Sequence, residues 1–189
     1  DEENIIAGLE SFTPDLQHSP GRFNMLDVNG ATVVVDYGHN TSSLQTICAT
    51  LKGFDAKRRL AVYSAAGDRR DEDFVDQGRL LGQNFDEVVI YEGQYVRGRE
   101  KGEITQFFKK GIIEGGPGKK IHEVVGAVAS MDLALSMLKP GDLLLMQADE
   151  VAETVEYLKK YLATNPAARE MANCDTEEVV SSTKSDDET

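Results

Sequence analysis

A short run of polar residues follows a predicted buried strand near the start of the chain. Ala31 to Asp36 is rich in valine, and Tyr37-Gly38-His39-Asn40 leads from it into a predicted helix. Open α/β sheets bind ligands where strands end and helices begin. Asp36 and the upstream Arg22 are therefore candidates to hold a charged, hydroxyl-rich ligand such as a nucleotide, because a carboxylate accepts ribose hydroxyls and a guanidinium binds phosphate or stacks on a base. The alternative is a surface ion pair beside a turn.

The residues of this turn have two interpretations each. Gly38 allows a sharp turn or the close approach of a ligand. Asn40 or Thr41 is a good N-cap for the following helix, and capping alone accounts for Asn40 as well as ligand contact does. His39 lies in the turn and not on an apolar helix face, so it is a candidate ligand contact. A single histidine does not make a metal site, and no metal site is predicted.

A second charged run, Gly67-Asp68-Arg69-Arg70-Asp71-Glu72-Asp73, joins a predicted strand to a predicted helix. Its backbone amides and the helix dipole are available to an anion. Glu72 and Asp73 are also ordinary first-turn residues, whereas two adjacent arginines are not favoured at a helix start. Asp68, Arg69, Arg70 and Asp71 are therefore candidate substrate-binding residues.

Two more polar groups lie next to strand ends. Arg97-Gly98-Arg99 follows the predicted strand 87–91, and both arginines could bind a phosphate or a carboxylate, although a solvated loop is an equal alternative. Gln147-Ala148-Asp149-Glu150 follows the predicted strand 142–146, and its acids could orient an amine or cap a helix. Because parallel strands end at one edge, we expect Arg22, Asp36, His39 and the 67–71 loop to face a common cleft.

The elements that must position these residues alternate along the chain. Asn29-Gly30 suits the type I′ turn of a hairpin formed by 23–28 and 31–36. Apolar periodicity predicts helices over 41–51, 71–85, 102–111, 125–138 and 151–162, and strands over 59–64, 87–91, 120–124 and 142–146. This succession predicts an α/β fold with a mostly parallel sheet, helices on both faces and an N-terminal β-hairpin.

Composition excludes several classes of function. The formal net charge of −13 argues against general nucleic-acid binding, which rests on Lys and Arg. No apolar run approaches the roughly 20 residues that span a bilayer, and the acidic start argues against a signal peptide. The two cysteines, Cys48 and Cys174, form no metal-binding pattern and are interpreted as ordinary thiols. We expect a cytoplasmic protein with neither nucleic-acid nor membrane partners.

The chain divides into three parts by composition. Residues 1–19 are interpreted as the end of a preceding domain, with a short helix from Glu3 to Leu9, and a linker. Residues 20–163 form the main domain. Residues 164–189 are rich in Ser, Thr, Asp and Glu and contain no aromatic residue, so we expect a disordered acidic tail.

Three motifs together resemble a known family. Pro20-Gly21-Arg22-Phe23, Val35-Asp36-Tyr37-Gly38-His39-Asn40 and the 67–73 run resemble the C-terminal domain of the Mur ligase superfamily, and the last run is most similar to its cyanophycin synthetase branch. The resemblance implies a Rossmann-like domain that closes over a central ATPase domain. It also implies that Arg22 and Asp36 hold the ATP ribose and that His39 and Asn40 lie at the nucleotide edge.

The implied reaction forms an amide bond through an acyl phosphate. The acid and amine substrates of the superfamily are amino acids and peptides or polymers, and in the cyanophycin branch arginine is added to an aspartate side-chain carboxylate. No Gly-x-x-x-x-Gly-Lys-Ser/Thr loop occurs in this chain, and Gly115 to Lys120 is interpreted as a turn. We therefore expect Mg²⁺ to be held mainly by the central domain, with no catalytic residue in this domain alone.

Two departures keep a second interpretation open. The phosphate loop is absent, and Thr41 stands where many relatives carry proline. The alternative is a non-catalytic nucleotide- or anion-binding module, or a protein-interaction module, with the same fold.

Overall fold

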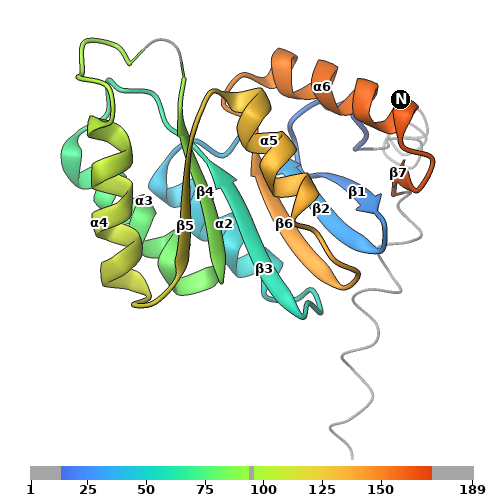
Figure 1. The fold of residues 1–189 in the computed structure, drawn as a ribbon, viewed down its shortest axis with the longest axis horizontal. Helices are drawn as coiled ribbons and strands as arrows, with labels where there is room; N and C mark the ends of the chain where they lie inside the picture. Colours follow the sequence, from blue (N-terminus) through green and yellow to red (C-terminus); the bar gives the residue numbers. More distant parts are fainter. Residues whose placement is uncertain (1–13, 94–95, 172–189) are drawn as a thin grey trace, which may run out of the picture.

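One seven-stranded sheet runs through the middle of the computed structural model, which describes residues 14–93 and 96–171 (Figure 1). The strand order is β5-β4-β3-β6-β2-β1-β7. The strands are β1 (Asn24–Val28), β2 (Ala31–Asp36), β3 (Arg58–Tyr63), β4 (Glu87–Glu92), β5 (Lys120–Val125), β6 (Asp142–Gln147) and β7 (Ala168–Glu170). The helices are α2 (Thr41–Leu51), α3 (Asp71–Asn84), α4 (Glu103–Gly115), α5 (Ala127–Ser136) and α6 (Val151–Thr164).

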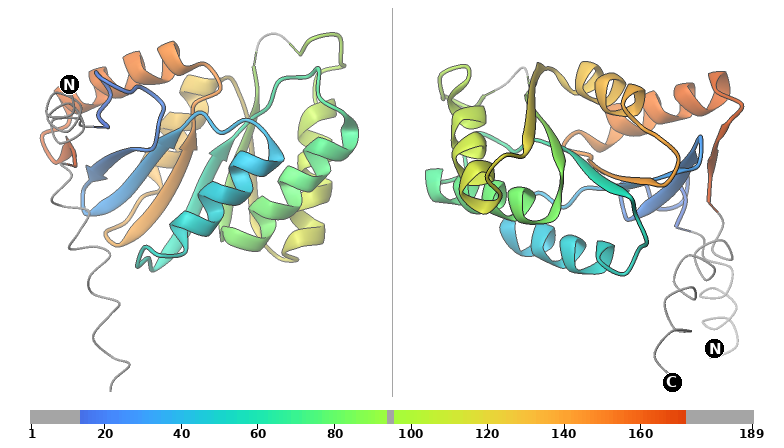
Figure 2. Two further views of the ribbon diagram at one scale, coloured as in Figure 1. Left: turned by 180° about the vertical axis from the view of Figure 1, so that it is seen from behind. Right: turned by 60° about the horizontal axis from the view of Figure 1, so that its bottom comes forward.

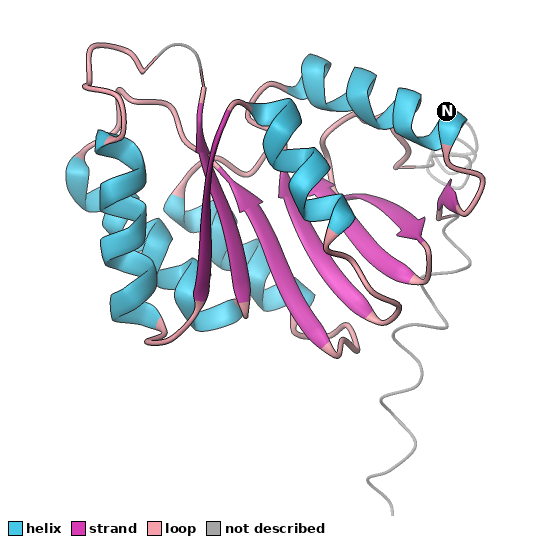
Figure 3. Cartoon of the chain, in the orientation of Figure 1, coloured by secondary structure: helices cyan, strands magenta, loops and turns pink. Residues whose placement is uncertain are grey.

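The pairing of the strands confirms the predicted fold class. The strands β5, β4, β3, β6 and β2 pair in parallel, and β1 pairs antiparallel with β2 (Figure 3). Asn29 and Gly30 have φ values of 55° and 79°, as the predicted type I′ hairpin turn requires. The sheet is thus mostly parallel and carries an antiparallel hairpin at one side.

Helices cover both faces of the sheet (Figures 1 and 2). The helices α2, α3 and α4 pack on one face, and α5 and α6 pack on the other, so two separate apolar clusters form. Strand β2 contributes to both clusters, with Val34 in the first and Val33 and Val35 in the second. Burial on both faces explains why its sequence is a continuous apolar run and does not alternate.

The pair α3 and α4 packs unusually closely because both helices contain glycine at the contact. A Cβ atom on Gly111 would lie 2.1 Å from the Val75 carbonyl oxygen, and one on Gly82 would lie 2.2 Å from the Ile112 carbonyl oxygen. We expected α4 to end at Gly111, but it continues to Gly115. The local helix-breaking tendency of glycine is outweighed here by the close packing that glycine permits.

The ordered domain extends beyond both of its predicted limits. Leu16 is 1% exposed, and its N–H donates to the Glu170 carboxylate at 3.2 Å. The expected tail begins with an ordered strand, because β7 pairs with the free edge of β1 and the Met171 N–H donates to the Met25 carbonyl at 2.9 Å. Backbone pairing gives this polar segment partners that its composition does not indicate. The expected helix from Glu3 to Leu9 and the expected tail from residue 172 onward lie outside the described residues.

Within residues 14–93 and 96–171, no helix has both the length and the apolar character needed to cross a membrane.

Candidate functional site

The carboxyl ends of the parallel strands bring the predicted polar groups to one edge of the sheet. In the register of β2 and β6, Asp36 lies opposite Gln147, and in that of β3 and β6, Val62 lies opposite Met146. The Ala148 N–H donates to the Asp36 carbonyl at 2.8 Å, which joins the segments after β2 and β6. The turns after β2, β3, β4 and β6 therefore share this edge, as the sequence predicts.

The Asp36 carboxylate holds the chain where it enters the hairpin. Its oxygens accept the N–H of Phe23 at 2.9 Å and the N–H of Gly38 at 2.7 Å. Phe23 has a φ of 51°, a left-handed conformation that is rare for an aromatic residue and needs such support. Each carboxylate oxygen can accept a second hydrogen bond, so Asp36 still fits a hydroxyl-bearing ligand.

Arg22 stacks beside Asp36 on an aromatic surface. The Arg22 guanidinium lies over the Tyr37 ring at 5.2 Å, and the Tyr37 and His39 ring centroids are 4.5 Å apart. Among the described residues, Arg22 and Asp36 form no ion pair with each other. The alternative interpretation of these two residues as a surface ion pair is therefore wrong for this structure. Arg22 is exposed and the two rings are partly buried, and the stack offers flat cationic and aromatic faces on which a base could lie.

Asn40 and Gly38 have structural roles that their positions explain. The Asn40 side chain accepts the Ser43 N–H at 2.9 Å in a capping box, so Asn40 is the N-cap of α2. A Cβ on Gly38 would lie 2.5 Å from the Ile47 Cδ1 atom, so a larger residue there requires the end of the Ile47 side chain to move. Both residues still lie at the carboxyl ends of the strands, where the nucleotide is expected to bind.

The loop after β3 is held by ion pairs. Arg97 pairs with Asp68 at 2.7 Å, and Arg70 pairs with Asp73 at 2.7 Å. The Arg69 Nε atom is buried without an acceptor in the part of the chain that the structure describes. A buried donor without a partner is costly, so this atom lowers the stability of the loop.

A cavity of about 840 Å³ opens at this edge between the loops after β3, β4, β5 and β6. Four carboxylates and one guanidinium contribute to its wall, namely Asp132, Asp149, Glu150, Glu153 and Arg97. The remaining wall includes small and apolar residues such as Ala65, Tyr91 and Val128. Among its described lining residues, the cavity is thus acid-rich and has a single positive side chain.

This cavity does not unite the two predicted groups of residues. Arg97 contributes to its wall, but Arg22, Asp36 and His39 are not among its described lining residues. Strand β6 lies between β2 and β3 and separates the turn after β2 from the loop after β3. None of residues 67–71 is among its described lining either, so the expectation that these residues face a common cleft stays a prediction.

Burial raises the pKa of Asp149, and the negative charge of Glu150 raises it further. A hydrogen bond from Gln147 and the positive charge of Arg97 act in the opposite direction. Asp132 and Glu153 were not predicted as site residues, because an acid on a helix has no local signal that distinguishes a cavity wall from a solvated face.

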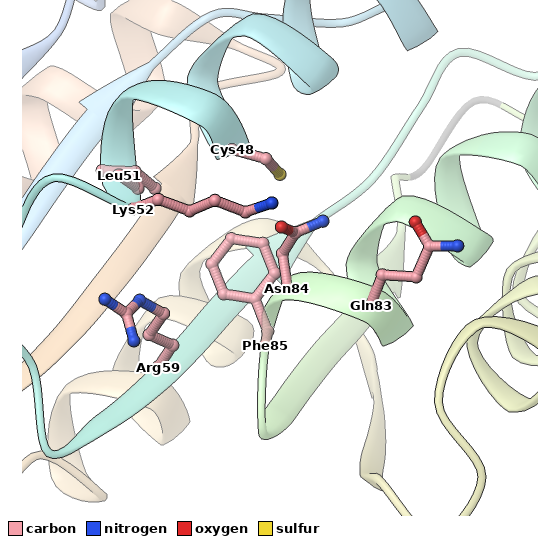
Figure 4. A pocket seen from close by; sticks show the side chains of 7 residues that line it. All are labelled: Cys48, Leu51, Lys52, Arg59, Gln83, Asn84 and Phe85. Atoms are coloured by element: carbon pink, nitrogen blue, oxygen red, sulfur yellow. The ribbon is translucent and has the colours of Figure 1, made fainter.

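A second hollow, of about 330 Å³, lies at the opposite edge of the sheet between the ends of α2 and α3 (Figure 4). Cys48, Lys52 and Arg59 contribute to it. Burial raises the pKa of the Cys48 thiol to about 11, so this thiol stays protonated, which confirms its interpretation as an ordinary buried cysteine. Within the described ranges, no three His, Cys, Asp or Glu side chains are grouped to hold a metal ion.

The fold is that of a Rossmann-like α/β domain, and domains of this kind bind ligands at the carboxyl ends of their parallel strands. Residues 21–150 match the family described as Mur ligase, glutamate ligase domain, and the chain belongs to this family.

Similar proteins are full-length ligases. Cyanophycin synthetase of Nostoc sp. (strain PCC 7120) is 29% identical over 157 residues, and that of Geminocystis herdmanii is 30% identical over 161 residues. These alignments cover 83% and 85% of this chain but only 17% and 18% of those proteins, so the chain spans less than a fifth of their length. A UDP-N-acetylmuramoyl-L-alanyl-D-glutamate–2,6-diaminopimelate ligase of Mesorhizobium japonicum is 27% identical, covering 67% of this chain and 26% of that protein.

Solved structures share the fold. Escherichia coli FolC in complex with DHPP and ADP superposes with a TM-score of 0.65 at 19% identity, covering 85% of this chain and 35% of that one. A UDP-N-acetylmuramoyl-L-alanyl-D-glutamate–2,6-diaminopimelate ligase superposes with a TM-score of 0.61 at 22% identity, covering 79% of this chain and 31% of that one. At these identities the likeness concerns the fold alone.

Proposed function

We propose that this chain is the C-terminal domain of an ATP-dependent amide ligase of the cyanophycin synthetase kind, in which it binds the nucleotide and the incoming amine. The observation that carries the proposal is the cavity wall of one guanidinium and four carboxylates. Such a wall complements an amino acid that has a free carboxylate for Arg97 and a cationic side chain for the acids. Arginine, the amine substrate implied by the cyanophycin resemblance, has this charge pattern.

The turn after β2 is the proposed nucleotide contact. Asp36 has acceptor capacity for ribose hydroxyls, and the stack of Arg22, Tyr37 and His39 offers a surface for the base or a phosphate. Asn40 lies beside them as the cap of α2. ATP, when bound, converts the acid substrate to an acyl phosphate. The cradle for the terminal phosphates and Mg²⁺ belongs to the proposed central ATPase domain.

The cavity is the proposed amine contact. Arg97 lies at its wall, and its present partner Asp68 is exposed, so a substrate carboxylate can compete for the guanidinium. Arg69, on the loop after β3 and partly exposed, is a further candidate for an anionic group of the acid substrate or the acyl phosphate. This domain would contribute mainly by holding the amine in line with the activated acid when the domains close.

The test uses the full-length ligase that contains this chain, with KM measured separately for ATP and for the amine. Arg22→Ala should raise the KM for ATP about ten- to hundredfold and leave that for the amine nearly unchanged, because one charge-assisted contact is worth about 1.5–3 kcal/mol. Arg97→Ala should show the reverse pattern.

Arg79→Ala is the matched control, because Arg79 pairs with Asp76 and Glu114 on the surface of α3 and α4 away from this edge. If the Arg22 and Arg97 variants both resemble this control, the ligase assignment of the two sites is wrong. The alternative of a non-catalytic nucleotide- or anion-binding or protein-interaction module would then be favoured.

A further inference from the structure

The loop that carries Arg97 ends in a strained turn. Arg97 and Gly98 have φ values of 49° and 89°, and the Arg99 N–H donates to the Val96 carbonyl at 3.1 Å, as in a type I′ turn. Arginine in the left-handed region is unfavourable and persists only where the surroundings hold it. The contacts that hold this turn therefore determine where the Arg97 side chain begins.

The Arg99 side chain makes these contacts. Its Nε atom donates to the Gly67 carbonyl at 2.7 Å, and its Nη2 atom donates to the Arg69 carbonyl at 2.6 Å. The same guanidinium pairs with Asp71 and with Glu103, each at 2.7 Å. Arg99 thus joins the loop after β3 to the loop after β4, and most of its donors are used inside the protein.

Aromatic packing fixes the plane of this guanidinium. Arg99 lies over the rings of Phe74 and Phe107 at 4.9 Å and 5.6 Å, and its side chain is only 15% exposed. A lysine in its place keeps the charge but loses the planar fork and the stacking. Arg99 is therefore unlike Arg97, whose side chain is more than half exposed.

The two loops touch along their backbones as well. A Cβ atom on Gly67 would lie 2.1 Å from the Val96 carbonyl oxygen, so only glycine permits this approach. Asp68 pairs with Arg97 directly next to this contact. The two loops form one unit, with Arg99 at its centre and Arg97 at its outer surface.

We propose that Arg99 is a positioning residue. The sequence predicts that Arg99 contacts the substrate, and the present inference replaces that prediction. It fastens the two loops together and so presents Arg97 to the carboxylate of the incoming amine. This inference rests on the proposed function, in which Arg97 contacts that carboxylate.

The test measures steady-state kinetics of the full-length ligase with Arg99→Lys, Arg97→Ala and the double variant. Arg99→Lys should raise the KM for the amine about 10- to 100-fold, the size expected for a displaced contact, and leave the KM for ATP within about twofold. Because Arg99 acts through Arg97, the double variant should be no worse than Arg97→Ala alone. Glu103→Gln, which removes the charge of one half-buried partner of Arg99, should act in the same direction by a smaller factor and keeps the test usable if Arg99→Lys folds poorly.

Arg79→Lys is the control, because it also replaces an arginine that forms two ion pairs, and it shows how much such a replacement changes the KM values by itself. If Arg97→Ala leaves the amine KM unchanged, the proposed amine site fails and this inference fails with it. If Arg97→Ala raises that KM but Arg99→Lys and Glu103→Gln do not, only the positioning role is wrong. The positioning role is also wrong if the effects of the two arginine variants add, or if Arg99→Lys lowers the melting temperature and changes both KM values equally.

Discussion

Several residues predicted as ligand contacts also hold the backbone that presents them. Asp36 supports the left-handed Phe23 and the Gly38 turn, and Asn40 caps α2. Substituting such a residue changes ligand contact and local structure together. The Arg22 side chain stacks on the Tyr37 ring and makes no hydrogen bond to the backbone of the described residues. Arg22 variants therefore report more cleanly on nucleotide binding than Asp36 variants do.

The Asp149 side chain leads to a prediction about how the stability of the protein depends on pH. Its pKa is raised by burial and by Glu150, so its ionised form costs stability in the folded state. This cost is absent below the ordinary aspartate pKa and grows as the pH rises through the raised pKa. Asp149→Asn should therefore be more stable than the wild type at about pH 7, and the difference should shrink as the pH falls towards about 4. Urea unfolding at both pH values measures this.

Glu156→Gln is the control with the opposite sign. Lys160 lowers the pKa of Glu156 through a hydrogen bond on the exposed face of α6, so the glutamine variant should gain nothing at neutral pH. An Asp149→Asn protein that is less stable than the wild type at neutral pH would contradict the account of the cavity as a desolvated acidic wall.

At the scale of elements, glycine sets how closely helices can approach. The contact between α3 and α4 places the backbone of each helix against glycines of the other, and the loops at the start of these helices carry the ion pairs of Arg97 and Arg99. The Tyr63 hydroxyl donates to Gln77 on α3 at 2.8 Å and lies 3.2 Å from the Gly38 carbonyl. The helix pair is thus a rigid base for the candidate amine site and is joined to the turn after β2.

Gly82→Ala tests this close approach. In an uncrowded helix the change would stabilise the protein by about 1 kcal/mol, because alanine has the higher helix propensity. Here the added Cβ would lie 2.2 Å from the Ile112 carbonyl oxygen, so the helices must separate. We expect a net loss of about 1–3 kcal/mol in the free energy of unfolding, measured by chemical denaturation.

Gly93→Ala is the matched control, because no described residue lies within 4 Å of the Cβ position at Gly93. That variant should differ little from the wild type. A stabilised Gly82→Ala protein would show that the helices do not pack as closely as described.

For the whole molecule, the sequence and fold together predict a domain that binds ligands but does not by itself catalyse a reaction of ATP. The chain has no Gly-x-x-x-x-Gly-Lys-Ser/Thr loop, and charge stabilisation at the transferring phosphoryl group supplies most of the catalysis in such reactions. We expect the 189-residue chain alone to release no phosphate from ATP and to form no amide bond. A phosphate-release assay with pure protein measures this, and turnover that Asp36→Ala abolishes would overturn the assignment of catalysis to another domain.

The sequence alone determined the elements and the polar groups that follow them. The Asn29-Gly30 turn, the apolar periodicity and the motif at Asp36 depend on near neighbours in the chain, so local patterns reveal them. The tertiary structure decided which of these groups meet. It placed β6 between β2 and β3, paired β7 with β1, built the cavity from four separate loops and turned Arg99 inward while Arg97 stayed exposed. These outcomes depend on contacts between residues far apart in the chain, and no local pattern encodes such contacts.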